Sequence, residues 1–198
     1  MKSPIYWSPW IYRLTMRILY GDAEKLREEV VAQVVPKGAS VLELCCGPGR
    51  LGLLLTKKNC EYMGLDCNSS FVAHAQKAGL NVQKSILPPL PSVPDFDYVV
   101  VVASLYHFKS QAELFVDSLW AKARKGLIIR EPIKNRSAHP NRLISTMSRI
   151  MSHPGVGDLP ERFSELEVDR LLSRYRENRN SYSKLVSDGP DKLYVLYK

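Results

Sequence analysis

The residues of this chain best suited to chemistry form a short loop that follows an apolar run. Glu43 lies in the apolar run over residues 40–44, and a tight turn with Gly47 and Gly49 follows it. Glycines let a backbone approach a ligand closely because no side chain stands in the way. Asp66 ends the next apolar run, where its carboxylate can reach the hydroxyls of a ribose. We therefore predict a nucleoside-bearing cofactor at the carboxyl ends of parallel strands.

Two kinds of cofactor fit this pattern. Gly47, Gly49 and Gly52 spell the G-x-G-x-x-G spacing of dinucleotide-binding folds. A carboxylate on the preceding strand does not attract a negatively charged pyrophosphate. In contrast, Glu43 would attract the ammonium and sulfonium groups of S-adenosylmethionine (SAM). A dehydrogenase also needs a substrate domain, for which 198 residues leave little room. We therefore favour SAM, with an exposed charge at the end of a strand as the structural alternative for Glu43.

Several segments resemble motifs of the class I SAM-dependent methyltransferases. Residues 43–49 resemble the first motif, acid-x-Gly-x-Gly-x-Gly, with Cys45 in place of its first glycine. Residues 64–66 resemble the second motif, residues 95–100 the fourth-strand motif and residues 125–132 the fifth strand. The resemblance extends from about Asp22 to the C-terminus.

The resemblance implies a fold and a set of cofactor contacts. The implied fold is α/β and Rossmann-like: a mainly parallel seven-stranded sheet with an antiparallel C-terminal strand and helices on both faces. SAM is the implied cofactor, and no metal is expected. The implied cofactor-binding residues are Glu43, Cys45, Gly47, Gly49, Asp66, Cys67, Ile86, Leu87 and Ser104. Ser85 stands where relatives often carry an acid for the adenine amine, so the backbone N–H groups of Ile86 and Leu87 are expected to serve instead.

Periodicity and capping residues place the elements along the chain. Apolar runs predict strands at residues 40–44, 62–66, near 82, 98–103, 126–129 and 193–197. Helical spacing predicts helices over residues 9–20, 22–36, 51–57, 69–78, 110–123 and 164–177. Two capping boxes, Ser110 with Glu113 and Ser164 with Glu167, mark the starts of the last two helices. Strands that alternate with helices predict βαβ units and a mainly parallel sheet.

The candidate catalytic residues, His107 and Tyr106, follow the fourth predicted strand. An imidazole titrates near neutral pH, so His107 suits the role of a general base, and Tyr106 is expected to form a wall of the same pocket. The alternative for His107 is a partly buried side chain that packs under the cofactor or caps the next helix. Glu131 ends the fifth strand and can hold a polar group of the substrate, with a salt bridge in a loop as the alternative.

Two segments are additions to the cofactor scaffold within a single domain over residues 1–198. Residues 1–21 contain Tyr6, Trp7 and Trp10, which we expect to close over the acceptor as a lid, with packing on the outside of the core as the alternative. Residues 133–163 form a long connection between the fifth and sixth strands, with an apolar helical face that includes Met147. We expect a second, inserted lid there, with a helix of the core as the alternative. The candidate substrate-binding residues are Tyr6, Trp7, Trp10, Glu131 and Met147.

Composition narrows the class of protein. The formal net charge is +8, from 28 Lys and Arg against 20 Asp and Glu, but the cations are spread along the chain. Four cysteines without C-x-x-C spacing favour reduced thiols in the cytoplasm over a zinc site or a disulfide framework. No run is apolar for the roughly 20 residues that cross a bilayer. The basic, aromatic N-terminus could still contact a membrane surface peripherally.

We predict an enzyme that methylates a small, partly hydrophobic acceptor, such as a lipid, quinone or phenol. The alternatives are a nucleic-acid methyltransferase, which the net charge suggests, and a non-catalytic SAM-binding module. The sequence lacks a recognisable RNA-binding module and a base-flipping motif, which disfavours nucleic acid as the partner. The acceptor atom and the oligomeric state do not follow from the sequence.

Overall fold

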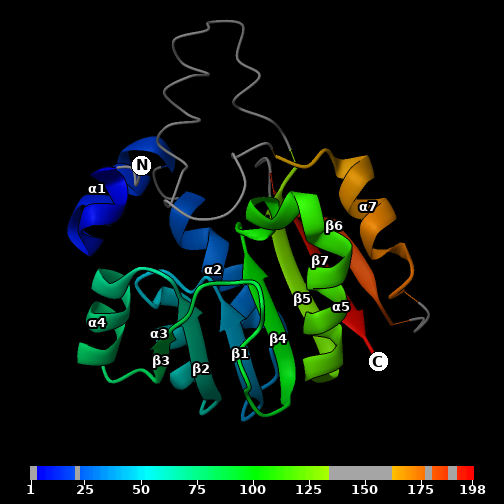
Figure 1. The fold of residues 1–198 in the computed structure, drawn as a ribbon, viewed down its shortest axis with the longest axis horizontal. Helices are drawn as coiled ribbons and strands as arrows, with labels where there is room; N and C mark the ends of the chain where they lie inside the picture. The colour runs from blue at the N-terminus through cyan, green and yellow to red at the C-terminus, as the bar shows by residue number, and fades with distance from the viewer. Residues whose placement is uncertain (1–3, 21–22, 134–161, 177–179, 187–190) are drawn as a thin grey trace, which may run out of the picture.

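The computed structural model describes residues 4–20, 23–133, 162–176, 180–186 and 191–198 (Figure 1). In this part of the chain, a central sheet is covered by helices on both faces. The inserted lid predicted over residues 133–163, including Met147, lies almost entirely outside the described residues.

Seven strands form the sheet in the order β3-β2-β1-β4-β5-β7-β6. They are β1 (Ser40–Leu44), β2 (Glu61–Asp66), β3 (Val82–Lys84), β4 (Phe96–Val102), β5 (Ala123–Pro132), β6 (Tyr182–Leu185) and β7 (Asp191–Tyr197). Strands β1 to β5 pair in parallel, whereas β7 runs antiparallel to both β5 and β6. The predicted Rossmann-like sheet with its antiparallel C-terminal strand is confirmed.

Two hydrophobic cores, one on each face of the sheet, hold the helices in place. Helices α2 (Ala23–Val34), α3 (Arg50–Thr56) and α4 (Ser69–Lys77) cover one face, and α5 (Ala112–Lys122) and α7 (Glu165–Ser173) cover the other (Figure 1). In β4, Val99 and Val101 enter the core under α5 and α7, and Val100 enters the opposite core. A strand buried on both faces has no polar face, which is why its sequence is continuously apolar.

Two short helices precede this scaffold at the N-terminus: the 3-10 helix η1 (Pro4–Trp7) and α1 (Pro9–Tyr20). Their inner side chains pack on α4, because the ring centre of Tyr12 lies 5.1 Å from that of Phe71 and 5.9 Å from that of Tyr6. Ile5 is buried in the same region. None of the described helices is both long enough and apolar enough to cross a membrane.

Helix α5 begins later than the sequence pattern predicts. A 3-10 helix, η2 (Leu105–Gln111), joins β4 to α5, and Ser110 lies inside it. Helix α5 then begins at Ala112, and its N-cap residue Gln111 makes no side-chain capping hydrogen bond. The predicted capping box of Ser110 with Glu113 is therefore wrong. The second predicted box is confirmed, since Ser164 and Glu167 cap each other at the start of α7.

Three other elements differ from the prediction. Strand β5 extends beyond residues 126–129, because its two ends pair with β4 at Phe96 and with β7 at Asp191. Helix α7 ends at Ser173, four residues before the predicted end at 177. Strand β6 was not expected from the apolar runs, because it is an edge strand whose side chains are mostly exposed.

Candidate functional site

The predicted chemistry-bearing residues come together at the carboxyl ends of β1, β2 and β4. The chain turns out of the sheet through left-handed backbone, with φ 54° at Cys45 after β1 and φ 50° at Ala103 after β4. Positive φ is uncommon outside glycine, and such strained positions cluster at ligand sites. Strands β1 and β4 are neighbours at the point where the strand order reverses, which is where open α/β sheets bind ligands.

The turn after β1 uses its two glycines for different purposes. Gly47 has φ 55°, and a Cβ atom added there would meet no atom within 4 Å. Gly49 has φ 83°, and a Cβ atom there would lie 2.6 Å from Leu80 and 2.9 Å from Ala75. Gly49 is therefore required for packing against α4, whereas Gly47 leaves an open cradle in which a cofactor can approach the backbone.

Asp66 joins the ends of β2 and β1. Its Oδ2 accepts a hydrogen bond from the amide of Gly47 at 2.8 Å, and its Oδ1 accepts one from the amide of Asn68 at 2.7 Å. The Asn68 side chain caps α4 by accepting from the amide of Ser70 and donates from Nδ2 to the carbonyl of Tyr6 at 2.7 Å. The carboxylate is thus fixed by backbone donors next to η1, in a position that fits an acid for ribose hydroxyls.

Glu43 is buried within β1 and is not an exposed strand-end charge. Only 3% of the residue is exposed, and the hydroxyl of Tyr62 donates to its Oε2 at 2.6 Å. Burial raises the pKa of Glu43 to about 8, and the hydrogen bond from Tyr62 opposes this shift. A nearby cation, such as the ammonium group of SAM, would favour the ionised form of this acid.

Glu131 is completely buried at the end of β5 and holds η2 in place. Its Oε2 accepts from the amide of Leu105 at 3.1 Å, and its Oε1 accepts from the amide of Tyr106 at 3.3 Å. Burial raises the pKa of Glu131 to about 7, against the effects of the Arg162 charge and the two amides. The carboxyl group therefore fixes the start of η2, which carries Tyr106 and His107.

Aromatic side chains from η1 and η2 converge at this edge of the sheet. The rings of Tyr106 and His107 are in contact, tilted by 40° with centres 4.1 Å apart, and both side chains are buried. The hydroxyl end of Tyr6 is buried too. Burial, together with the neighbouring Tyr106 and Asp66, raises the pKa of Tyr6 well above its usual value. The guanidinium of Arg162, just before α7, lies 4.3 Å from the centre of the Tyr106 ring.

The other residues predicted to contact the cofactor lie around the same edge at different depths. Cys45 is half-buried, and desolvation followed by the charges of Asp66 and Cys67 raises the pKa of its thiol well above the usual value. Ser104 and Leu87 are buried, Cys67 is half-buried and Ile86 is 61% exposed.

The predicted substrate-binding residues separate into two groups. Tyr6 and Glu131 lie at the aromatic cluster, as described above. Trp7 and Trp10 are 63% and 70% exposed and point mainly to solvent, so the structure does not bring them to the cluster. Met147 lies outside the described residues.

Three residues of this region were not expected from the sequence. Asn68 is an ordinary N-cap residue before Ser69, so its position could have been found from capping rules. Tyr62 reaches Glu43 because Gly64 pairs with Glu43 across the strands and leaves room for the Tyr62 ring. Arg162 lies far along the chain, and only the fold places it over Tyr106.

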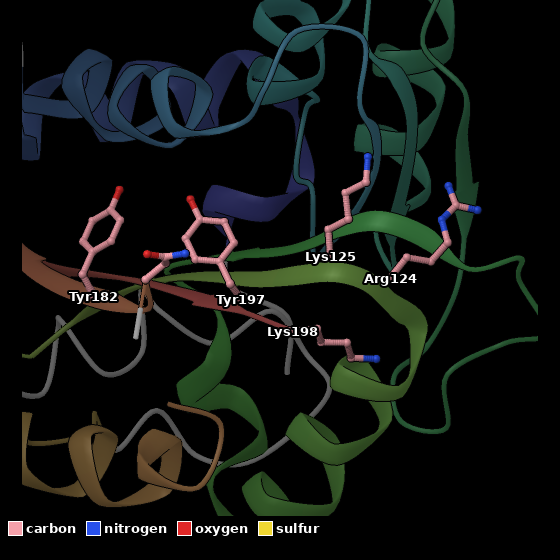
Figure 2. A pocket seen from close by; sticks show the side chains of 6 residues that line it. Arg124, Lys125, Tyr182, Tyr197 and Lys198 are labelled. Carbon is pink, nitrogen blue, oxygen red and sulfur yellow. The ribbon is translucent and has the colours of Figure 1, made fainter. Parts of the chain in front are cut away.

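A pocket at the opposite end of the parallel strands is a separate feature (Figure 2). It is lined by Arg124, Lys125, Asn180, Tyr182, Tyr197 and Lys198. Arg124 and Lys125 both pair with Asp97, each at 3.3 Å. Burial acts to raise the pKa of Asp97, but the amide of Ser40 and the Lys125 ammonium hold it below its usual value. Two of the three cations therefore share one carboxylate, and the pocket lies at the other end of the sheet from Asp66.

The fold and the residues at the carboxyl edge of the sheet define a class of protein. The fold is that of the class I methyltransferases that use SAM as cofactor. Residues 41–126, from β1 to the start of β5, match the family model of a methyltransferase domain. No curated protein matches the chain significantly.

Solved structures share this fold at low sequence identity. The methyltransferase in a complex with the Trm112 methyltransferase activator of Haloferax volcanii is 12% identical, with a TM-score of 0.71 over 100% of this chain and 98% of that chain. A SAM-dependent methyltransferase from Aquifex aeolicus is 19% identical, with a TM-score of 0.61 over 92% and 96%. Magnesium protoporphyrin IX methyltransferase from Synechocystis PCC 6803, solved with bound SAH, is 16% identical, with a TM-score of 0.62 over 89% and 81%.

Proposed function

We propose that this methyltransferase transfers the SAM methyl group to a small, partly apolar acceptor that lies between η1 and η2. The observation that carries the proposal is the convergence of the half-buried Tyr6 with the buried Tyr106 and His107 at the carboxyl edge of the sheet. Aromatic walls with few polar groups favour a flat or apolar acceptor, such as a phenol, a quinol or a lipid.

The proposed cofactor position is the turn after β1. The open cradle at Gly47 and the fixed carboxylate of Asp66 support it, with Asp66 on the ribose hydroxyls and residues 86 and 87 at the adenine. Glu43, Cys45, Gly49, Cys67 and Ser104 complete the proposed cofactor-binding set. Bound SAM supplies a methyl group on a good leaving group, so the task of the protein is alignment, which can be worth roughly 7 to 11 kcal/mol.

We assign the proton transfer to His107 and the alignment of its helix to Glu131. A hydroxyl acceptor must lose its proton as the methyl group arrives, and an imidazole nitrogen can accept it. Both carboxyl oxygens of Glu131 already accept backbone hydrogen bonds, which favours a positioning role over direct contact with the acceptor. Tyr106 contacts the His107 ring and would form the wall against which the acceptor lies.

The proposal is tested by SAH release from the purified chain with a panel of phenols, quinols and fatty acids. We expect turnover with at least one of them. SAM binding without SAH release for any acceptor would identify a non-catalytic binding module. Turnover only with RNA or DNA, with binding that falls steeply as salt increases, would instead identify a nucleic-acid methyltransferase.

The role of His107 leads to a direct prediction. His107→Ala and His107→Asn should each lower kcat by about 10² to 10⁴, because neither side chain can accept the proton. SAM affinity should stay nearly unchanged, and the acid limb of the pH–rate profile should vanish. His74→Asn is the matched control, because His74 is an exposed histidine on α4. A His107→Asn variant that keeps most of its rate would show that the acceptor needs no base from this residue.

We further propose peripheral contact of α1 with a membrane surface. Trp10, Leu14 and Ile18 are spaced four residues apart and are 70%, 44% and 73% exposed. Arg13 and Arg17 are exposed on the same helix. An exposed apolar stripe beside cations is typical of helices that lie in the interface of an anionic bilayer.

A further inference from the structure

We propose that Arg162 binds an anionic oxygen group of the methyl acceptor, a carboxylate or a phosphate, beside the Tyr106 ring. This inference rests on the proposed function, because the group it binds belongs to the acceptor. It narrows the acceptor from a small, partly apolar molecule to one that also carries a negative charge.

The carbonyl group of Arg162 and the two residues that follow it are held in place. Lys109 in η2 donates from Nζ to the carbonyl of Arg162 at 3.4 Å. The next residue, Phe163, is 5% exposed within the core under α5 and α7. Ser164 then caps α7. Glu131 fixes η2, and η2 carries both the Tyr106 ring and Lys109, which binds the Arg162 carbonyl. The positions of the guanidinium and of the ring therefore depend on the same anchored helix.

Among the described residues, the Arg162 guanidinium forms no ion pair with an acid. Its centre lies 4.3 Å from the centre of the Tyr106 ring, and among the described residues its Nη1 atom is buried without a hydrogen-bond partner. An aromatic face attracts a cation but accepts few of the hydrogen bonds that a guanidinium can donate. A buried donor without a partner is costly, so an arriving anion would relieve that cost.

Glu131, whose pKa the Arg162 charge lowers, does not form a described ion pair with this arginine. Its two oxygens are bound by the amides of Leu105 and Tyr106, and the described ion pairs do not join it to Arg162. The Arg162 charge nevertheless lowers the pKa of both Glu131 and Tyr6, although burial dominates each shift. The cation lies over the Tyr106 ring of η2, at the site where the acceptor is proposed to bind between η1 and η2.

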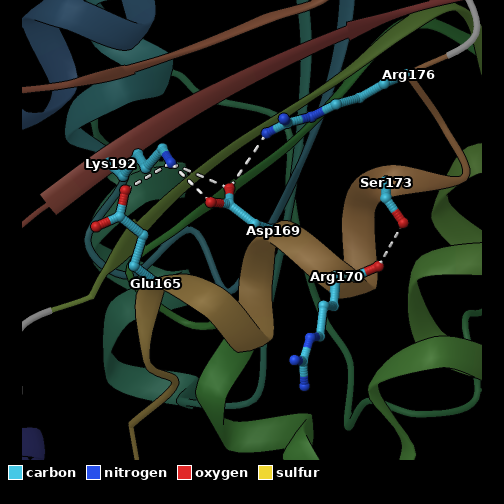
Figure 3. Close-up of polar contacts among 6 residues, drawn as sticks. All are labelled: Glu165, Asp169, Arg170, Ser173, Arg176 and Lys192. Atoms are coloured by element: carbon cyan, nitrogen blue, oxygen red, sulfur yellow. Dashed lines mark hydrogen bonds and ion pairs between the residues drawn. The ribbon is translucent and has the colours of Figure 1, made fainter.

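Other arginines on this scaffold are compensated by acids. Arg50, Arg124, Arg130, Arg174 and Arg176 pair with Glu28, Asp97, Asp191, Asp117 and Asp169, respectively. Figure 3 shows this arrangement beside α7, where Asp169 pairs with both Arg176 and Lys192, and Glu165 pairs with Lys192. Arg162 is partly buried, and among the described residues it has an aromatic ring where these arginines have a carboxylate. A guanidinium fork matches carboxylate and phosphate oxygens in geometry.

Binding measurements with the SAH-loaded protein test the inference. The probes are 4-hydroxybenzoate, phenyl phosphate and the neutral 4-hydroxybenzyl alcohol, each titrated by calorimetry. We expect the two anions to bind more tightly than the alcohol. Arg162→Gln should weaken the anions about 10-fold to 100-fold, the usual range for hydrogen bonds to a charged group, and leave the alcohol unchanged. The anion affinity of Arg162→Lys should lie between that of the parent chain and that of Arg162→Gln. Arg170 is an exposed arginine on α7, so Arg170→Gln should bind the anions as tightly as the parent chain does.

Stability distinguishes a ligand-binding role from a structural one. Arg162→Gln removes a cation without an acid partner, so Tm without ligand should stay the same or rise. A clear loss of Tm together with equal weakening of all three probes would overturn the inference, as would an alcohol that binds as tightly as the acids. Comparing the loss for benzoate with the loss for phosphate shows which anion the site prefers.

Failure of the proposed function would look different. If anions bind through Arg162 but no acceptor is methylated, the anion site stands and the methyl-transfer proposal fails. If neutral phenols are methylated equally well by the parent and by Arg162→Gln, methyl transfer stands and this inference fails.

Discussion

Two buried carboxyl groups, on opposite faces of the sheet, fix the two halves of the proposed site. Glu43 follows Val41 on the face covered by α2, α3 and α4, and Glu131 follows Ile129 on the face covered by α5 and α7. Glu43 supports the strand before the cofactor turn, and Glu131 supports the helix with the candidate catalytic side chains. Both acids are costly to bury when charged, which makes them functional candidates on physical grounds.

The raised pKa values of these acids predict how stability depends on pH. Burial raises the pKa of Glu43 from 4.5 to about 8 and that of Glu131 from 4.5 to about 7, so the folded chain holds protons that the unfolded chain loses. Stability should therefore fall as pH rises from about 4.5 to about 8. Urea unfolding across this range without ligand measures the effect. Glu43→Gln should flatten the upper part of the slope, whereas Glu61→Gln, an exposed acid at the start of β2, should not.

Asp66 leads to a prediction about cofactor affinity. Asp66→Ala should weaken SAM binding by about 1 to 3 kcal/mol, because a ribose hydroxyl loses its acceptor. The variant also releases the amides of Gly47 and Asn68, so Asp66→Asn, which keeps an acceptor oxygen, should lose less. Calorimetry with SAM and SAH measures both variants against Glu61→Ala. Unchanged affinity in Asp66→Ala, or tight NAD binding by the parent chain, would contradict the proposed cofactor site.

At this scale the sequence identified local features better than long-range ones. The glycine turn and Asp66 are close in sequence and have fixed spacing, so their relation to one another could be predicted. The tie between Glu131 and η2, the bond from Tyr62 to Glu43 and the position of Arg162 depend on strand order and register. No local pattern encodes those contacts.

The elements show the same division between local and tertiary causes. The capping box of Ser164 and Glu167 formed as predicted because both partners lie within one turn of α7. The similar pattern at Ser110 failed because Glu131 binds the amides of Leu105 and Tyr106 and keeps that stretch in η2. A bond from a neighbouring strand thus overrides a capping preference worth about 1 kcal/mol.

The start of α7 gives a prediction at the scale of one element. Ser164→Ala should destabilise the chain by about 1 kcal/mol, because the amide of Glu167 loses its acceptor. For a chain of this size the expected fall in Tm is roughly 2 to 4 °C. Ser173→Ala, an exposed serine at the other end of α7, is the control for thermal unfolding. A fall of the same size in both variants would mean that the cap adds nothing of its own.

For the molecule as a whole, the alternation of strands and helices was enough to predict the sheet. Continuous apolar runs indicated the buried parallel strands. The resemblance to class I methyltransferases predicted that the C-terminal strand runs antiparallel. The edge strand β6 could not be found from apolar runs, since its exposed side chains need no apolar character. The orientation of the N-terminal aromatic side chains could not be predicted from the sequence either, because both faces of α1 carry large apolar residues. Tyr12 and Met16 are partly covered, whereas Trp10 and Leu14 face solvent.

This outward stripe predicts membrane binding by the intact chain. Residues 4–20 contain no acid, so a second copy of α1 offers Arg13 and Arg17 no opposite charge, whereas an anionic bilayer does. The full chain should float with vesicles of phosphatidylcholine and phosphatidylglycerol and bind phosphatidylcholine alone weakly. Each exposed cation should contribute about 1 kcal/mol at such a surface.

Substitutions on the stripe separate docking from the proposed lid. Replacing Trp10, Leu14 and Ile18 together by serine should abolish flotation, since each buried apolar side chain is worth about 1.5 to 3 kcal/mol, while SAM binding stays intact. Leu114→Ser, at a 73% exposed leucine on α5, should float like the parent. Deleting residues 1–20 should abolish flotation and also turnover, because Tyr6 leaves the site with the stripe. A truncated chain that turns over at the parent rate would disprove the lid, and a serine variant that still floats would disprove docking through α1.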